Sequence, residues 1–317
     1  MTRTQKQLLG LLAVQLVLIV LFRSPFSGAS GSVALKPLLP ELQAFTPARI
    51  ELFGADEDKV TLIRQGEGWR LEELGGFPAD ANKVDDLVQK LRGLQVRRPV
   101  VSSSRYHEAF KVADDTHEGR VKLFDDAADE PKIDLLLGTS ANYRSLHVRS
   151  RSEDPVYEVR DLATYDVRAE PSNWADREFI DVPEAELSGV VVSNAAGSFE
   201  LVRDDDGWSA AGSDIVLDQD KVSTLVRSAS SLRLAEPLGP VGVDGAEPAD
   251  AALTVTLRWG AGEELVYWIG DKLEDPDTQR YATRRGFDFR GAIWDSSVSN
   301  LIEKKLEELA VDEASGS

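Results

Sequence analysis

Hydrophobic and polar residues alternate in two similar stretches of the chain, residues 60–64 and residues 198–203. After a short polar turn, each stretch is followed by a Gly-Trp pair; the pairs are Gly68-Trp69 and Gly207-Trp208. An alternating strand, a turn that contains Gly and an aromatic residue on the return strand are typical of a β-hairpin. The sequence therefore predicts the same hairpin twice.

A helical pattern follows each hairpin. Asp80 and Asp218 are suited to cap a helix N-terminus, and a Lys-Val pair comes three residues after each of them. Apolar residues then recur at the spacing of one helix face. These residues are Val84, Leu87, Val88, Leu91 and Leu94 in the first copy and Val222, Leu225, Val226, Ala229 and Leu232 in the second. We expect an amphipathic helix after each hairpin.

The later parts of the two copies also match. Apolar strands at 133–138 and 264–270 end in Gly138 and Gly270. The further matched segments are strands at 146–149 and 281–284, strands at 155–159 and 291–295, and closing helices at 161–167 and 298–309. The pattern predicts an α+β fold, a tandem duplication of a mostly antiparallel β-β-α-β-β-β-α unit. The first repeat is predicted at residues 38–175, the second at 176–309, and a solvated acidic tail at 310–317.

The N-terminus predicts a membrane segment. Residues 7–22 carry no charge and are flanked by Lys6 and Arg23. As a helix they would span roughly 24 Å, slightly less than the ~30 Å hydrocarbon core. Arg3 and Lys6 place the N-terminus in the cytoplasm by the positive-inside rule. We expect a single-pass transmembrane helix at 1–23 and a linker at 24–37, with everything after the helix on the extracytoplasmic side.

A cleaved signal peptide is the alternative interpretation of the N-terminus. Residues 27–29, Ser-Gly-Ala, would serve as the small-residue cleavage site. Arg23 and the length of the apolar run favour the uncleaved anchor, because a signal peptide usually passes directly from a shorter apolar region to small polar residues.

Composition and charge exclude several classes of site. The 317 residues include 36 Lys and Arg, 55 Asp and Glu, three His and no Cys, which gives a formal net charge of −19. An acidic chain is poorly suited to nucleic acid, because phosphate binding needs a cationic face. Without Cys there is no disulfide, thiolate zinc site or catalytic thiol. We expect no nucleic-acid partner, no cofactor and no metal.

Two acidic segments raise the question of a calcium site. Residues 204–207 (Asp-Asp-Asp-Gly) lack the spacing of an EF-hand loop, and a hairpin turn explains them. The acidic loop at 271–277 is better explained as a solvated loop. The dispersed His107, His117 and His147 do not indicate a metal triad.

No other segment predicts catalysis. The serines at 102–104 lack a Gly-x-Ser-x-Gly motif, and Gly-rich nucleotide loops are absent from the sequence. The basic residues Arg92, Arg97 and Arg98 could dock an acidic partner, but a helix C-terminus explains them better. Five tryptophans could form a sugar-stacking surface, although core packing is the better explanation for the two in the hairpins. They are Trp69, Trp208, Trp259, Trp268 and Trp294.

We therefore expect no catalytic, cofactor-binding or metal-binding residues. The residues that the pattern singles out are structural repeat markers, which are Gly68, Trp69, Gly138, Gly207, Trp208 and Gly270.

The chain resembles the domain of unknown function 4340 (DUF4340) over residues 38–309. The resemblance is carried by residues 62–70 and 79–94, by their partners at 201–208 and 217–232, and by the strand ends at Gly138 and Gly270. The second copy departs from this pattern at 215–218, where Ile-Val-Leu-Asp replaces the Phe-Pro-Ala-Asp of 77–80. The resemblance implies an envelope protein encoded beside ABC-transporter components of the gliding-motility type. It implies no catalytic residues.

The function expected from this resemblance is a non-catalytic accessory or scaffold subunit of an envelope ABC transporter. Its partners would be the permease, the ATPase and other envelope subunits, and its location the bacterial inner membrane with the two repeats in the periplasm. The alternative is a periplasmic module that binds a polymer or peptide in a cleft between the repeats. Exposed aromatic residues in that cleft would favour the alternative, whereas packed aromatic residues would favour the scaffold. An envelope enzyme would need convergent titratable residues in a pocket, which the sequence does not predict.

Overall fold

The computed structural model describes residues 34–56, 58–125, 129–142, 145–241, 248, 251–260 and 262–312. The membrane segment predicted at 1–23, most of the linker at 24–37 and most of the tail at 310–317 lie outside these residues. The last two linker residues form strand β1 (Lys36–Pro37). Among the described residues, no helix has the length and apolar character needed to cross a membrane.

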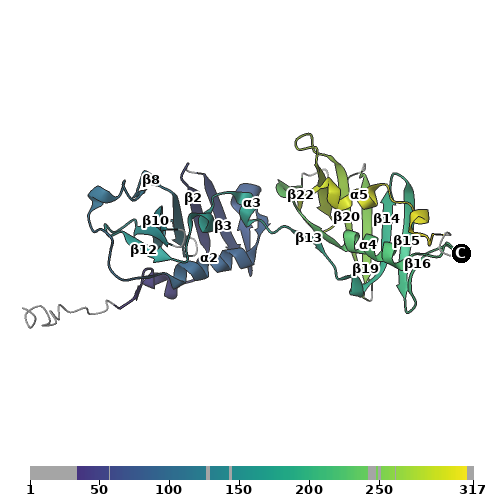
Figure 1. Ribbon diagram of the computed structural model, residues 1–317, viewed down its shortest axis with the longest axis horizontal. Coiled ribbons are helices and arrows are strands. Elements are labelled where there is room, and N and C mark those ends of the chain that lie inside the picture. The colour runs from purple at the N-terminus through teal and green to yellow at the C-terminus, as the bar shows by residue number, and fades with distance from the viewer. Residues whose placement is uncertain are drawn as a thin grey trace, which may run out of the picture.

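The first half of the chain forms a large antiparallel sheet, shown on the left of Figure 1. Its strands in chain order are β2 (Arg49–Gly54), β3 (Lys59–Gln65), β4 (Gly68–Leu71), β5 (Phe77–Ala79), β9 (Gly119–Phe124), β10 (Ile133–Asn142), β11 (Ser145–Ser150) and β12 (Tyr157–Arg160). Across the sheet they lie in the order β12-β11-β10-β9-β2-β3-β4-β5.

The second half forms a similar antiparallel sheet, shown on the right of Figure 1. Its strands are β14 (Leu187–Asn194), β15 (Gly197–Asp204), β16 (Gly207–Ala210), β18 (Glu236–Pro240), β19 (Leu253–Trp259), β20 (Glu263–Lys272), β21 (Gln279–Arg284) and β22 (Phe289–Trp294). Their order is β16-β15-β14-β19-β20-β21-β22-β18. Read in the opposite direction, the second order matches the first for seven strands, from β22 opposite β12 to β16 opposite β4. The eighth strand differs: β5 lies beside β4 in the first sheet, whereas β18 lies beside β22, at the opposite edge, in the second.

One long helix covers a face of each sheet. Helix α2 (Ala81–Gly93) is capped by Asp80, whose carboxylate accepts a hydrogen bond from the Lys83 amide at 3.2 Å. Helix α4 (Gln219–Ser230) is capped by Asp218, which accepts from the Asp220 and Lys221 amides at 3.0 and 3.2 Å. All ten residues of the two predicted apolar stripes are buried. The structure thus confirms both helices, both caps and both core-facing sides.

Short elements complete each half. Strand β6 (Gln95–Val96) pairs with β1, and β17 (Ser231–Arg233) pairs in the same way with β13 (Glu178–Asp181). The short helices are η1 (Pro40–Gln43), η2 (Glu72–Leu74), η3 (Ser104–Tyr106), η4 (Thr164–Val167), α3 (Pro171–Trp174), η5 (Glu184–Glu186), α5 (Asp295–Ile302) and η6 (Leu306–Leu309).

The strand registers of the two halves correspond. In the first sheet Leu62 lies opposite both Ile50 and Leu71. In the second, Leu201 lies opposite both Val190 and Ala210. All of these side chains are buried. The structure is therefore α+β with two large antiparallel sheets in two similar halves, consistent with the predicted internal repeat.

The predicted order of elements was wrong in its strand count. Of the seven strands that the two large sheets share, three precede the long helix and four follow it. The prediction omitted β9 and β19 and did not count the leading strands β2 and β14. Strand β9 pairs with β2, and β19 with β14, near the middle of each sheet. The alternation of Leu, Thr, Val, Thr and Leu at 253–257 was a clear strand signal that the prediction missed.

The predicted alignment of the later strands was also shifted. The prediction matched Val148 with Thr283. In the structure Val148 lies opposite Leu137 and Ala282 lies opposite Ile269, so Val148 corresponds to Ala282, one residue earlier. In the next strand Val159 corresponds to Ile293, two residues from the predicted match. Burial explains the first shift, because a one-residue slip moves a side chain to the other face of the sheet.

Neither closing helix has the predicted extent. The segment predicted at 161–167 contains η4, and α3 follows it; the segment predicted at 298–309 is divided between α5 and η6. The last residues of each half form a backbone hydrogen bond with the aspartate that caps its long helix. The Asp80 amide donates to the Trp174 carbonyl at 2.7 Å, and the Asp218 amide donates to the Leu309 carbonyl at 2.8 Å.

The segment between β6 and β9 distinguishes the first half. It contains η3, β7 (Val112–Ala113) and β8 (Thr116–His117), and it contributes Val112 to a small second core with Leu136 and Val156. The buried Arg149 guanidinium holds the segment by donating to the Val112 carbonyl at 2.7 Å and to the Asp114 carboxylate at 2.6 Å. This segment covers part of the face of β10.

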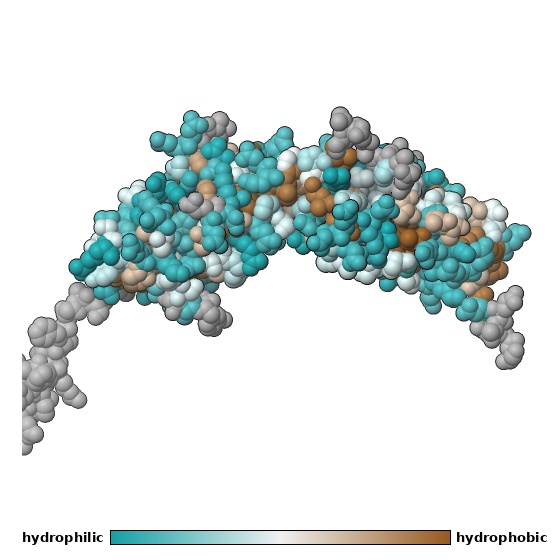
Figure 2. Space-filling model, turned by 90° about the horizontal axis from the view of Figure 1, so that it is seen from above, coloured by the Kyte–Doolittle hydropathy of each residue, from teal (hydrophilic) through white to brown (hydrophobic). Residues whose placement is uncertain are grey.

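Three phenylalanines join the two halves. Phe77 on β5 is fully buried, and its ring centroid lies 5.8 Å from that of Phe287 and 5.1 Å from that of Phe289, both of the second half. Beside them Gly75, with a left-handed φ of 65°, faces Pro240 so closely that a Cβ would lie 2.6 Å from the proline ring. Seen from above, the joined halves form one elongated, arched body (Figure 2). The junction is therefore packed with side chains.

Gln219 closes the free edge of β16. Its side-chain amide accepts from the Trp208 N–H at 2.9 Å and donates to the Trp208 carbonyl at 3.0 Å. In the first half the corresponding edge, that of β4, is paired with β5. The glutamine thus takes the hydrogen-bonding place of a strand and keeps the edge from pairing with another chain.

We expect Gln219→Ala to lower the free energy of unfolding by about 1–2 kcal/mol, because both Trp208 backbone groups lose their partner. Gln89→Ala is the matched control, since Gln89 lies exposed on α2, and it is expected to stay within about 0.5 kcal/mol of the wild type. Urea unfolding followed by circular dichroism measures both. Equal stabilities of the two variants would contradict the strand-substituting role of Gln219.

Candidate functional site

The two tryptophan markers are core residues. Trp69 and Trp208 are buried, and in each hairpin an arginine guanidinium, of Arg64 or Arg203, lies 5.8 Å from the tryptophan ring centre. Trp268 is also buried, Trp259 is half-buried and Trp294 is exposed. The five tryptophans considered as a stacking surface therefore do not share one exposed face.

The glycine markers differ in their physical role between the halves. Gly207 has φ +118° and lies against the Gln219 side chain, whereas Gly68 has open space where a Cβ would be. A Cβ on Gly138 would lie 2.0 Å from the Phe110 carbonyl oxygen, whereas a Cβ on Gly270 would meet nothing closer than 3.4 Å. Gly207 and Gly138 are thus required by their surroundings, and their partners Gly68 and Gly270 are not.

The other candidate segments have structural surroundings. The acidic turn at 204–207 closes the β15–β16 hairpin, with the Asp206 amide bonded to the Asp204 carboxylate at 2.9 Å. His107 is bonded to the Asp154 carbonyl, and His147 to Thr139. No cluster of three or more potential metal-binding His, Asp or Glu side chains occurs in the described part of the chain. In the basic stretch, the Arg92 guanidinium donates to the Leu42 carbonyl and attaches η1 to α2.

A groove of about 400 Å³ runs between α2 and the η4–α3 segment, and we call it the α2 groove. Its lining combines three cations, two carboxylates, two aromatic rings, one leucine and one amide. These residues are Lys83, Asp86, Leu87, Lys90, Tyr165, Asp166, Arg168, Asn173 and Trp174. The α2 residues recur at positions i, i+3, i+4 and i+7, which places them on one side of the helix.

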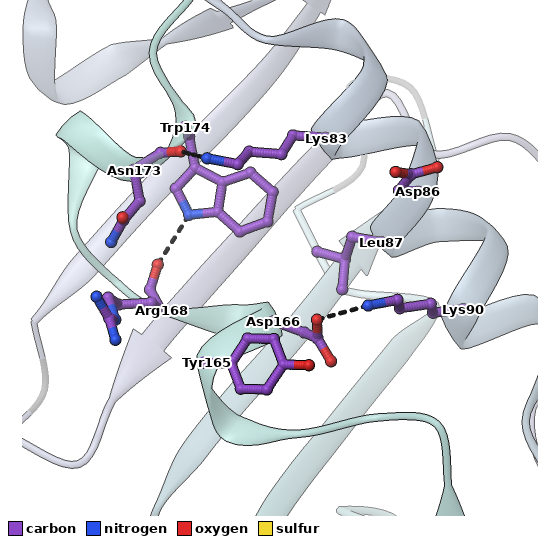
Figure 3. A pocket seen from close by; sticks show the side chains of 9 residues that line it. All are labelled: Lys83, Asp86, Leu87, Lys90, Tyr165, Asp166, Arg168, Asn173 and Trp174. Carbon is purple, nitrogen blue, oxygen red and sulfur yellow. Dashed lines mark hydrogen bonds and ion pairs between the residues drawn. The ribbon is translucent and has the colours of Figure 1, made fainter.

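Hydrogen bonds fix the walls of the α2 groove (Figure 3). The Lys83 ammonium donates to the Asn173 carbonyl at 2.6 Å, and the Trp174 indole N–H donates to the Arg168 carbonyl at 2.8 Å. The Lys90 ammonium pairs with the Asp166 carboxylate at 2.6 Å. Trp174 is buried, whereas Tyr165 stands 69% exposed at the groove.

The charges of the α2 groove are only partly compensated. The hydrogen bond that Lys90 donates to the Asp166 carboxylate raises the pKa of Lys90, against the opposing effect of burial. Within the described residues, no carboxylate forms an ion pair with Lys83 or Arg168. With three cations and two carboxylates, one of them Asp86, the groove lining has an excess of one positive charge beside the exposed Tyr165 ring, which is suited to binding an anionic group.

A second hollow, of about 650 Å³, adjoins the α2 groove, because Tyr165 and Arg168 line both. It extends over the β2–β3 turn, where Asp56 and Asp58 contribute carboxylates. The two hollows share Tyr165 and Arg168 in their linings, and we call the two together the trough.

A groove of about 460 Å³ occupies the corresponding place in the second half, between α4 and the η6 segment. Lys221 corresponds to Lys83, and Leu225 to Leu87. The Lys221 ammonium bonds to the Ala310 carbonyl and to the Asp312 carboxylate, both at 3.1 Å. The sequence prediction used the repeated Lys-Val pair only to align the two copies. In the structure the lysine of each pair lines a groove beside the long helix of its half.

A protein-family model matches a large part of this chain. The family described as "Domain of unknown function (DUF4340)" matches residues 69–254, more than half of the chain, from β4 of the first half to β19 of the second. The match lies within the predicted span of 38–309 and is shorter than it. Neither the curated proteins nor the solved structures contain a match to this chain.

Proposed function

We propose that this chain, which belongs to the DUF4340 family, is a non-catalytic accessory subunit of an envelope ABC transporter. In this proposal residues 1–23 anchor the chain in the inner membrane of a bacterium. The two halves, derived from a tandem duplication, stand in the periplasm and form a scaffold for the permease, the ATPase and other envelope subunits. A single anchor would hold both halves at high effective concentration near these partners.

The observation that carries the proposal is the packed junction between the halves. Phe77 is fully buried between them, and its ring contacts fill the place where a cleft-binding protein would need an opening. Two sheets joined in this way give an elongated body (Figure 2). Such a body is suited to contact several partners along its length.

Affinity purification from detergent-solubilised membranes tests the proposal. We expect a transporter permease and its ATPase to be enriched with the full-length chain, relative to an unrelated single-pass protein of similar abundance. Identification of the bound proteins by mass spectrometry is the measurement. Recovery of the chain as a lone monomer with a bound glycan or peptide would overturn the scaffold and favour the ligand-binding module.

A further inference from the structure

We propose that the α2 groove binds an acidic peptide segment of a partner protein, with one carboxylate of that segment on Lys83. This inference concerns a single contact site of the first half. It does not require the partner to be a transporter subunit, and a purified protein is sufficient to test it.

The second half shows what the corresponding lysine binds. Lys221 and Lys83 occupy the same position on their helices, three residues after the capping aspartate. Each donates to a backbone carbonyl of the closing segment of its half: Lys83 to that of Asn173, and Lys221 to that of Ala310, two residues further along in the shared register. Lys221 additionally binds the carboxylate of Asp312. In the second half, the lysine at this position therefore has a carboxylate as its partner.

The first half has the opposite charge at that place. Isolated bridges pair Ala79 with Ala175 and Leu217 with Ala310, so the two closing segments have the same register. Two residues beyond the bridged alanine, the second half has Asp312 and the first half has Arg177. The Arg177 guanidinium donates to the Ser172 carbonyl at 3.0 Å. Lys83 thus has a backbone carbonyl as its partner, as Lys221 does, but it lacks the carboxylate that Asp312 provides to Lys221.

The shape and charge of the trough favour a peptide as the source of that carboxylate. The two adjoining hollows provide a path longer than a single anion needs, with the exposed Tyr165 ring along it. Three cations and two carboxylates line the α2 end, whereas two cations and four carboxylates line the β2–β3 end, so the charge balance changes from positive to negative along the trough. A segment with an acidic residue at one end and neutral or basic residues at the other would complement both ends.

The test is an NMR titration of the purified protein with a synthetic peptide of residues 309–317 of this chain, Leu-Ala-Val-Asp-Glu-Ala-Ser-Gly-Ser. This probe contains Asp312, the residue that binds Lys221. The indole N–H resonance of Trp174, assigned with Trp174→Phe, reports on the groove wall. We expect a saturable shift that weakens about tenfold or more when Asn and Gln replace the acidic residues of the peptide.

Matched variants locate the site. Lys83→Gln is expected to weaken binding about tenfold, and Arg168→Gln by a smaller factor, because Arg168 lines both hollows. Arg98→Gln removes the same charge at an exposed position outside the trough and is expected to leave binding unchanged, as is Lys221→Gln. Equal weakening by Arg98→Gln, no saturable shift with the wild type, or a Lys83-dependent shift with phosphatidylglycerol vesicles in place of the peptide would overturn the proposal.

Discussion

Gly138→Ala is expected to lower the free energy of unfolding by about 3 kcal/mol, whereas Gly270→Ala is expected to change it by less than about 1 kcal/mol. A Cβ at position 138 would lie 2.0 Å from the Phe110 carbonyl oxygen and 2.8 Å from that of Lys111. Both are backbone atoms, so the segment between β6 and β9, which contains Phe110 and Lys111, would have to move away from β10. At position 270 the nearest contact, the Tyr281 Cβ, is at an ordinary 3.4 Å.

Urea unfolding curves of both alanine variants measure the difference, and amide hydrogen exchange assigns it to the first half. The Thr139 N–H donates to the Phe110 carbonyl at 2.9 Å, so its protection reports directly on the contact that Gly138 permits. We expect Thr139 to exchange faster in Gly138→Ala and at the wild-type rate in Gly270→Ala. Similar stability losses in the two variants would show that the close approach to Phe110 is not what requires the glycine.

Phe77→Ala is expected to destabilise the protein by about 3–5 kcal/mol and to uncouple the unfolding of the two halves. Phe77 is fully buried in the first half and makes edge-on ring contacts with Phe287 and Phe289 of the second. Its removal leaves a cavity and breaks the aromatic contact across the junction. We expect calorimetry to resolve two transitions in place of one cooperative transition.

Phe287→Ala separates the two effects and serves if Phe77→Ala fails to fold. Phe287 is only partly buried, and it contacts Phe77 from the far side of the junction. We expect this variant to uncouple the halves with a smaller loss of total stability. A single cooperative transition in Phe287→Ala, with the wild-type midpoint, would mean that the phenyl contacts do not couple the halves.

The sequence was sufficient to predict what depends on local pattern. The hairpins at Trp69 and Trp208 and the helices capped by Asp80 and Asp218 follow from alternation, helical spacing and capping chemistry within short windows. The extent of the closing helices could not be predicted in this way, because α3 and η6 bond to backbone far away in the chain.

The candidate site shows the same limit. Lys83 was visible as part of a repeated pair, but its groove depends on Tyr165, Arg168 and Trp174, which the fold brings to α2 from the other end of the first half. The charge difference between Arg177 and Asp312 could be read from the sequence only once the bridges had given the register. The contact between Phe77 and the two phenylalanines of the second half likewise depends on how the sheets are joined.

The way the sheets are joined has a consequence for assembly. The halves meet head to tail, with β5 of the first beside β18 of the second, and contacts of this kind can in principle repeat into an open-ended polymer. Both outer ends oppose such growth: residues 100 and 101 are hydrogen-bonded to Val156 at the β12 end, and Gln219 occupies the β16 edge. Like the terminal caps of a solenoid, these contacts occupy backbone groups at the two outer edges, where a third unit would have to pair.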